Sequence, residues 1–169
     1  MADEELIALA ERLQGLCLSR GLTVAVAESC TGGLIAATLT EVPGASGYFL
    51  GGVVSYADEA KTRILEVAAP TIEAHGAVSA QAARSMAIGA RNQFGSSLAA
   101  SVTGISGPGG GTSDKPVGLT YVGLATDEVA DVRRFVWAGD RSSNRHESVR
   151  AVLEWLIEET EGPAREGPR

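Results

Sequence analysis

The sequence is poor in the residues that hold metals and disulfides. Its 169 residues include only two cysteines, Cys17 and Cys30, and two histidines, His75 and His146. The cysteines lack CxxC spacing, and two histidines with two isolated cysteines do not form the cluster that a zinc site needs. We therefore predict reduced thiols, no metal and no cofactor.

Basic residues are also scarce, with 14 Lys and Arg against 21 Asp and Glu, for a net charge of -7. General affinity for nucleic acid needs clustered Lys and Arg, so no nucleic-acid partner is expected. A small anion is still compatible, because one helix N-terminus or a pair of arginines can bind a phosphate. The sequence has no start of signal-peptide type and no apolar run long enough to span a bilayer, which predicts a cytoplasmic protein without membrane contact.

Aromatic residues make up only 5% of the chain, whereas 44% of it is hydrophobic. The core must then be built mainly from Ala, Val, Leu and Ile, which favours tight packing of helices on a sheet. The length suits one domain, with no internal repeat or linker. We assign residues 1–161 to this domain, and residues 162–169, which hold two prolines and no apolar cluster, to a disordered tail.

Hydrophobic spacing predicts alternating helices and strands. Helices are predicted over 3–20, 34–39, 57–65, 70–75 (or a turn), 79–94 and 149–157. Strands are predicted over 23–27, 48–56, 97–102, 117–125 and 129–137, the last two as a hairpin. This order predicts a three-layer α/β/α sandwich, with a mixed, mostly parallel sheet and helices on both faces. The predicted helix 79–94 is rich in alanine, and the predicted strand 48–56 contains glycines. Both suit close packing, so we also expect a homo-oligomer, with a dimer favoured.

The segment 27–33 joins a strand-like run to a helix-like run and contains Ser29. A serine at such a junction lies at the carboxyl edge of the sheet, where open α/β sheets bind their ligands. The simpler interpretation is that Ser29 or Thr31 only caps the helix, since both types are favoured N-caps. Cys30 is a rival nucleophile, although a small buried apolar residue is the favoured interpretation for it.

Tyr56 and Lys61 follow the second strand, so they are expected near Ser29. A lysine in a short polar helix is usually a solvated surface charge. It can act as a base for serine only when neutral, which requires burial or a neighbouring cation, and a tyrosine hydroxyl can then relay the proton. The chemistry predicted from these three residues is acyl transfer to water.

An anion that develops on an attacked carbonyl needs hydrogen-bond donors. Backbone N–H groups near Gly32 and Gly33, or donors at Thr103 and Gly104, could supply them. The glycine-rich segment 103–112 fits neither the P-loop nor the GxGxxG pattern, so the mechanism of neither motif applies.

Six motifs together resemble the CinA C-terminal-domain family over about residues 5–158. They are AESCTGG at 27–33, GGVVSYADEAK at 51–61, HGAVS at 75–79, VTGISGPGGG at 102–111, KPVG at 115–118 and GDRSSNR at 139–145. Enzymatic members of this family are amidohydrolases that convert nicotinamide mononucleotide (NMN) and water to nicotinate mononucleotide and ammonia. The resemblance implies this activity, with Ser29 as nucleophile, Lys61 as general base and Tyr56 as the assisting hydroxyl.

The resemblance also implies Thr103 and Arg145 as supporting residues near the substrate. The predicted substrate-binding residues are Thr31, Gly32, Gly33, Thr103, Gly104, Arg141 and Arg145. An arginine here could bind the nucleotide phosphate or keep Lys61 neutral by charge repulsion, and the sequence does not choose. A salt bridge of Arg141 or Arg145 to Asp140 or Glu147 is the alternative without a function.

A second functional hypothesis comes from the family's link by name to competence and DNA damage. In it the domain is a catalytically silent accessory module that acts through protein partners. Many members carry an additional N-terminal domain, whereas Met1 here stands just ahead of the first predicted helix. We therefore expect the stand-alone form.

Overall fold

A five-stranded sheet forms the centre of the molecule in the computed structural model, which describes residues 3–162. The strand order is β2-β1-β3-β4-β5. The strands are β1 (Val24–Glu28), β2 (Phe49–Val54), β3 (Leu98–Gly104), β4 (Leu119–Ala125) and β5 (Ala130–Val136). β1 pairs in parallel with both β2 and β3, and β4 pairs antiparallel with both β3 and β5. Only β4 is therefore antiparallel to the other strands, as expected when a hairpin is added to a parallel sheet.

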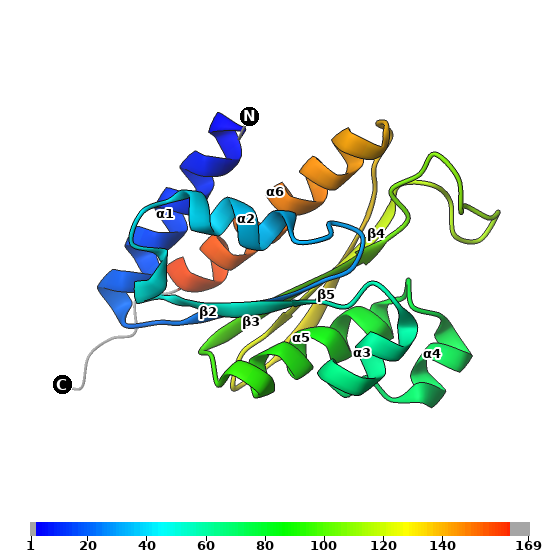
Figure 1. Cartoon of the computed structure of the whole chain (residues 1–169), viewed down its shortest axis with the longest axis horizontal. Helices are drawn as coiled ribbons and strands as arrows, with labels where there is room; N and C mark the ends of the chain where they lie inside the picture. Colours follow the sequence, from blue (N-terminus) through cyan, green and yellow to red (C-terminus); the bar gives the residue numbers. More distant parts are fainter. Residues whose placement is uncertain (1–2, 163–169) are drawn as a thin grey trace.

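Helices cover both faces of this sheet (Figure 1). On one face lie α1 (Glu4–Arg20), α2 (Leu34–Glu41) and α6 (Arg141–Glu161), and on the other lie α3 (Asp58–Leu65), α4 (Ala69–His75) and α5 (Ala80–Phe94). A short 3₁₀ turn, η1 (Ala45–Gly47), occupies a segment predicted as loop. The predicted three-layer α/β/α class is confirmed.

The two faces of β1 belong to two different hydrophobic clusters. Val24 and Val26 pack in the cluster under α1, α2 and α6, whereas Ala25 and Ala27 pack in the cluster under α5. Successive strand residues point to opposite faces, so a central strand covered on both sides is apolar throughout. Its one charged residue, Glu28, is therefore unusual.

The alanine-rich face of α5 is used within the chain. Its five buried apolar residues, Ala82, Ala83, Met86, Ala87 and Ala90, pack toward the sheet. The carbonyl oxygen of Ala83 lies so close to Gly123 of β4 that a Cβ there would overlap it. One of the two arguments for a dimer is thus accounted for by internal packing. The edge strand β2 still exposes Leu50 and Val54, and the dimer stays a prediction.

Two predicted helix ends, at Gly21 and Ser79, are confirmed, whereas α6 begins at Arg141, eight residues before the predicted start at 149. Gly21 ends α1 in the left-handed conformation (φ 63°), and Ser79 caps α5 by accepting a hydrogen bond from the N–H of Ala82 at 3.1 Å. Gly162 follows α6, and the rest of the predicted tail lies outside the described residues. Among residues 3–162, no helix combines the length and apolarity needed to cross a membrane.

Candidate active site

A cavity of about 270 Å³ lies at the carboxyl edge of β1 and β3. Six of the ten predicted site residues line it, namely Ser29, Tyr56, Lys61, Thr103, Gly104 and Arg141. The β3–β4 loop projects from the same end of the sheet and contributes glycines to the wall (Figure 1). Thr31, Gly32, Gly33 and Arg145 are not part of this lining. The ends of parallel strands have thus brought residues from distant segments together.

Lys61 is the buried cation of this cavity. The side chain comes from α3, is only 1% exposed, and places Nζ 3.1 Å from Oγ of Ser29. Nζ also donates to the carbonyl oxygens of Ser55 at 2.7 Å and Tyr56 at 3.3 Å. The interpretation as a solvated surface charge is therefore wrong, because the short polar helix turns this one residue inward.

Burial changes the chemistry of Lys61. Loss of solvation lowers the pKa of its ammonium from the ordinary lysine value of 10.5, and the negative charge of Asp58 partly opposes this shift. A lowered pKa raises the neutral fraction near physiological pH. A neutral amine within hydrogen-bond distance of a serine hydroxyl can remove its proton, which is the arrangement of an activated nucleophile.

Ser29 is held by backbone contacts. Its N–H donates to the carbonyl of Val102 at 3.0 Å, and its carbonyl accepts from the N–H of Gly32 at 3.1 Å. The N-cap of α2 is Gly33, and no cap residue donates or accepts through a side chain there. The alternative in which Ser29 or Thr31 caps the helix is therefore wrong, and the Ser29 hydroxyl faces Lys61 instead.

Glu28 supplies the hydrogen-bond acceptor that the cap residue of α2 lacks, a role that was not predicted from the sequence. Its carboxylate is 1% exposed and accepts hydrogen bonds from the hydroxyl of Thr31 at 2.6 Å and the N–H groups of Ile35 at 2.8 Å and Ala36 at 3.2 Å. The signal that could have found it is a single acid at the end of an otherwise apolar central strand. Such a residue must find donors within the fold.

Tyr56 reaches the cavity from the end of β2. The residue is 60% exposed, and its hydroxyl accepts a hydrogen bond from Nη2 of Arg141 at 3.3 Å. Its contact with Lys61 is made by the backbone carbonyl, not by the ring hydroxyl. The relay role of the Tyr56 hydroxyl stays a prediction.

The two arginines of α6 differ in their contacts. Arg141 lines the cavity and donates from Nη1 to the carbonyl of Gly107 at 2.9 Å, whereas Arg145 donates from Nη2 to the carbonyl of Thr31 at 2.7 Å. Neither forms an ion pair with Asp140 or Glu147. The salt-bridge interpretation is wrong because these acids are engaged elsewhere: Asp140 accepts from the N–H of Ser143, and Glu147 lies 3.6 Å from Arg150.

The third strand and the loop after it close the cavity. The Thr103 hydroxyl is 1% exposed and donates to the carbonyl of Ala77 at 2.8 Å. The glycine-rich loop is tied to its surroundings by Lys115, whose Nζ donates to the carbonyl of His75 at 2.6 Å, and by Asn144, whose amide donates to the carbonyl of Ser106 at 3.1 Å. The loop is thus attached at several points, a feature that its composition did not indicate.

Cys30 lines the cavity but is a poor nucleophile. Its side chain is 6% exposed, and burial raises the pKa of its thiol to about 11, so the reactive thiolate is scarce at neutral pH. The prediction of a small buried residue is confirmed. Its backbone N–H donates to no other residue within residues 3–162 and interacts only with its own side chain, whereas the N–H of Gly32 is occupied by Ser29. The Cys30 amide is therefore the candidate donor to an oxyanion beside Ser29.

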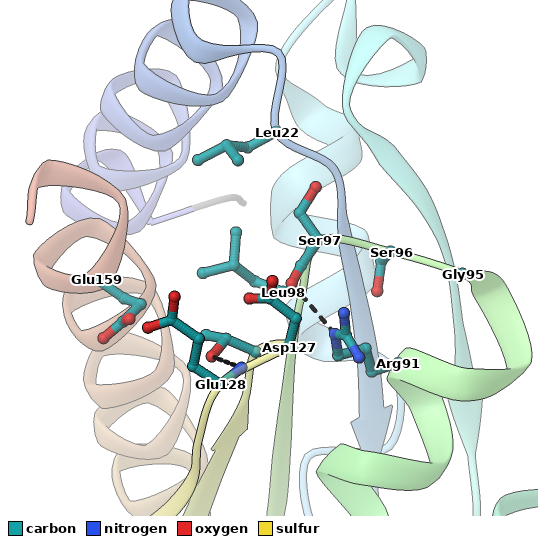
Figure 2. Close-up of a pocket in the computed structure, with 10 residues that line it drawn as sticks. Leu22, Arg91, Gly95, Ser96, Ser97, Leu98, Asp127, Glu128 and Glu159 are labelled. Atoms are coloured by element: carbon teal, nitrogen blue, oxygen red, sulfur yellow. Dashed lines mark hydrogen bonds between the residues drawn. The ribbon is translucent and has the colours of Figure 1, made fainter. Parts of the chain in front are cut away.

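A larger cavity of about 440 Å³ lies at the opposite edge of the sheet (Figure 2). Asp127, Glu128 and Glu159 lie on one side of it and Arg91 on the other, with Nε of Arg91 donating to the carbonyl of Ser97 at 3.3 Å. This lining offers no nucleophile paired with a base. In the described part of the chain, no group of three His, Cys, Asp or Glu residues could hold a metal ion. The smaller cavity is therefore the candidate active site.

Comparison with known proteins agrees with these observations. A family model described as the CinA C-terminal domain matches residues 6–160. A CinA-like protein of Citrifermentans bemidjiense is 55% identical over 146 residues, which cover 86% of this chain and 35% of the relative. A putative competence-damage inducible protein of Clostridium perfringens is 44% identical over 155 residues, covering 92% of this chain and 38% of the relative. The chain thus spans little more than a third of these longer relatives.

Solved structures are similar over almost their whole length. The competence/damage inducible protein CihA from Agrobacterium tumefaciens superimposes with a TM-score of 0.92 at 38% identity, covering 96% of this chain and 99% of that one. A competence-damaged protein (CinA) superfamily protein from Escherichia coli gives a TM-score of 0.87 at 29% identity, covering 93% and 92%. The chain therefore has the fold of these CinA superfamily structures.

Proposed function

Because the chain belongs to the CinA C-terminal domain family, we propose that it hydrolyses the carboxamide of NMN to nicotinate mononucleotide and ammonia. The observation that carries the proposal is the contact between a buried Lys61 amine and the Ser29 hydroxyl at 3.1 Å, inside a cavity at the carboxyl edge of the sheet. Amide hydrolysis needs a strong nucleophile and a group that protonates the leaving amine, and this pair supplies both.

In the first half-reaction, Oγ of Ser29 bonds to the carboxamide carbon while its proton passes to neutral Nζ of Lys61. The negative charge that develops on the carbonyl oxygen is stabilised by the Cys30 N–H. The carbon–nitrogen bond then breaks, the Lys61 ammonium donates its proton to the leaving nitrogen, and ammonia departs. An ester of Ser29 and a neutral Lys61 remain.

In the second half-reaction, Lys61 removes a proton from water, and the resulting hydroxide attacks the ester carbon. The bond to Oγ of Ser29 breaks, Lys61 returns the proton to Oγ, and nicotinate mononucleotide is released. No redox step and no metal are required. The burial that lowers the pKa of Lys61 serves both halves of the cycle, since each begins with the neutral amine.

The nucleotide phosphate is assigned to Arg141. This guanidinium lines the cavity with Ser29, and its present partners, the Gly107 carbonyl and the Tyr56 hydroxyl, are both neutral. A phosphate forms stronger, charge-assisted hydrogen bonds than either of these acceptors. Arg145 is assigned the role of holding the turn 29–33 in place, because it already binds the Thr31 carbonyl and lies outside the cavity lining.

The remaining parts of the proposal rest on the sequence. The enzyme acts in the cytoplasm without a cofactor and assembles as a homo-oligomer, with a dimer favoured. Static light scattering of the purified chain tests the last point, and a monomer at working concentration would contradict it.

The experiment that tests the function is ammonia release by the purified protein. NMN, nicotinamide riboside and free nicotinamide are compared, with Ser29→Ala as the inactive control and Cys30→Ser as a control expected to retain turnover. Hydrolysis of NMN that is lost only with Ser29 supports the proposal. Full turnover by Ser29→Ala would contradict it, and silence of the well-folded protein on all three amides would favour an accessory module that acts through partners.

A further inference from the structure

Glu28 and Ser29 are neighbours at the end of β1 whose side chains serve opposite sides of the sheet. Ser29 contacts Lys61 of α3, whereas the Glu28 carboxylate contacts the first turn of α2. The backbone of the pair is fixed by the neighbouring strands, through donation from the N–H of Ser55 to the Glu28 carbonyl at 2.8 Å and from the N–H of Ser29 to the Val102 carbonyl at 3.0 Å. These bonds do not fix the backbone of the turn that follows Ser29.

We infer that Glu28 is a positioning residue for the proposed hydrolysis: its carboxylate fixes the turn 29–33, so that Ser29 and the Cys30 amide face the substrate. The inference rests on the proposed function. One carboxylate oxygen accepts from both the Thr31 hydroxyl at 2.6 Å and the Ile35 N–H at 2.8 Å, and the other accepts from the Ala36 N–H at 3.2 Å. The carboxylate thus joins the middle of the turn to the start of the helix.

The choice of a glutamate here is not explained by helix capping alone. Burying a carboxylate is costly unless its donors are all supplied, whereas a serine or asparagine at the cap position would satisfy the helix locally. The cap position is instead Gly33, with φ 100°, and Gly32 is also left-handed, with φ 60°. These two glycines let the turn bend back so that Thr31 reaches the carboxylate.

Thr31 is held from two directions. Its hydroxyl donates to Glu28, and its carbonyl accepts from Arg145 at 2.7 Å and from the Leu34 N–H at 3.2 Å. The residue is completely buried. Because Thr31 is the next residue but one after Ser29, fixing its orientation also fixes the peptide of Cys30, which lies between them. The Glu28 carboxylate therefore acts on the reacting groups through Thr31 without touching the substrate.

The test compares Glu28→Gln with wild-type protein. Glutamine has the same shape but replaces one oxygen by an NH₂ group, and in either orientation this NH₂ faces a backbone N–H of Ile35 or Ala36, so one donor loses its acceptor. Asp3→Asn is the matched control, because Asp3 also caps a helix, accepting from the N–H of Glu5 at 2.9 Å, but lies at the start of α1.

Two readouts separate positioning from simple stabilisation. The first is the kinetics with NMN, measured well below the melting temperature of each variant. We expect Glu28→Gln to lower kcat by about 10- to 100-fold, because small displacements of reacting groups are costly, with KM unchanged. The midpoint of its pH profile should not move, since Lys61 is shifted by burial and by Asp58. Asp3→Asn should match wild type in both parameters.

The second readout does not depend on NMN. A fluorophosphonate probe labels an activated serine: Oγ of Ser29 bonds to phosphorus, fluoride leaves, and the hydroxyl proton passes to Lys61. The labelling rate of Glu28→Gln should fall by a factor similar to that of kcat. Thr31→Val, which removes the hydroxyl partner, should behave like Glu28→Gln, whereas Thr31→Ser should restore the rate. In the double variant Glu28→Gln with Thr31→Val, the fold-decrease in labelling rate should be smaller than the product of the two single fold-decreases.

The outcomes separate this inference from the proposed function. A folded Glu28→Gln variant with wild-type kcat and labelling rate would overturn the inference and leave the function intact. A wild-type protein that reacts with the probe but not with NMN would overturn the substrate assignment, and the labelling rates would still test Glu28. A folded wild-type protein that is inert to both would overturn both.

Discussion

The amine of Lys61 lies 3.1 Å from the hydroxyl of Ser29, although 32 positions separate the two residues in the chain. Parallel pairing of β1 with β2 brings the ends of both strands together, and α3 begins four residues after β2 ends. The amine is almost fully buried, so its protonation state is set by the fold. Two of the predictions below concern this one group.

The first prediction concerns the pH dependence of activity. Since the pKa of Lys61 is lowered by burial, the acid limb of kcat/KM should have its midpoint below the ordinary lysine value of 10.5, and activity should rise as pH increases through it. Asp58 raises this pKa, so Asp58→Asn should move the midpoint down. Ammonia release measured across the pH range is the test.

Glu59→Gln is the matched control for this experiment. Glu59 neighbours Asp58 in the first turn of α3, but it does not line the active-site cavity and is not a cause of the Lys61 shift. Its removal should leave the midpoint unchanged. Equal shifts in both variants would mean that overall charge, and not the Asp58–Lys61 interaction, sets the midpoint.

The second prediction concerns stability. The unfolded chain keeps the Lys61 proton up to a higher pH than the folded chain, because the folded pKa is lowered. Between the two pKa values the unfolded state binds more protons, so Lys61 makes the free energy of unfolding rise with pH, by at most about 1.4 kcal/mol per pH unit. Below the folded pKa the full destabilising effect of Lys61 is present.

Lys61→Met removes this contribution while keeping most of the length of the side chain. Urea unfolding from neutral pH to about pH 10 should show a wild-type free energy that rises relative to that of the variant. Taking the difference cancels the titration of groups that do not interact with Lys61. The variant should also lose about 10²- to 10⁴-fold in kcat, as expected for removal of a general base. Parallel curves would mean that the Lys61 pKa is the same in both states.

Much of this site could be predicted from the sequence because it follows from chain topology. A serine at a strand–helix junction, a lysine after the next parallel strand and a polar end to β3 must meet at one edge of the sheet. The burial of Lys61 could not be predicted, because its short helix is polar and only the packing of α3 against α5 turns this residue inward. The sequence marks Glu28 only as an acid at the end of an apolar strand, and its partners on α2 could not be predicted, because they depend on a contact between a strand and a helix.

The contacts of Arg141 and Arg145 could not be predicted from the sequence either. Both lie on α6, where a spacing of four residues puts them on one face of the helix. The spacing did not show that Arg141, the first residue of the helix, reaches the Gly107 carbonyl while Arg145 reaches the Thr31 carbonyl. Such differences depend on which loops meet the helix, which is decided by the assembled fold.

The third prediction separates the roles of these two arginines. Arg141→Ala should weaken binding of nicotinate mononucleotide by about 10- to 100-fold, as expected for loss of a charge-assisted contact, and should not weaken binding of nicotinate riboside, which lacks the phosphate. Arg145→Ala should lower the labelling rate of Ser29, because it loosens Thr31. Calorimetric titration of both ligands into each variant is the measurement. Phosphate-dependent loss in Arg145→Ala instead would reverse the assignment.

The fourth prediction uses two glycines inside helices. Gly89 of α5 and Gly15 of α1 each interrupt a helix, and replacing glycine by alanine in a helix normally stabilises it by about 1 kcal/mol. A Cβ on Gly15 would meet nothing within 4 Å, whereas a Cβ on Gly89 would overlap the carbonyl oxygen of Leu65 at the end of α3. Gly15→Ala should therefore stabilise the protein, and Gly89→Ala should destabilise it by about 2 kcal/mol.

The same pair of variants links packing to chemistry. The clash at Gly89 pushes on α3, and α3 carries Lys61, whose backbone carbonyl accepts from the N–H of Val67 at 3.2 Å just beyond the helix end. A shift of α3 lengthens the contact between Lys61 and Ser29, so Gly89→Ala should lower kcat even in the folded protein, while Gly15→Ala should leave it unchanged. Urea unfolding and ammonia release are measured on both variants. A destabilised Gly89→Ala protein with full kcat would mean that α5 moves to relieve the overlap with Leu65 and that α3 keeps its position.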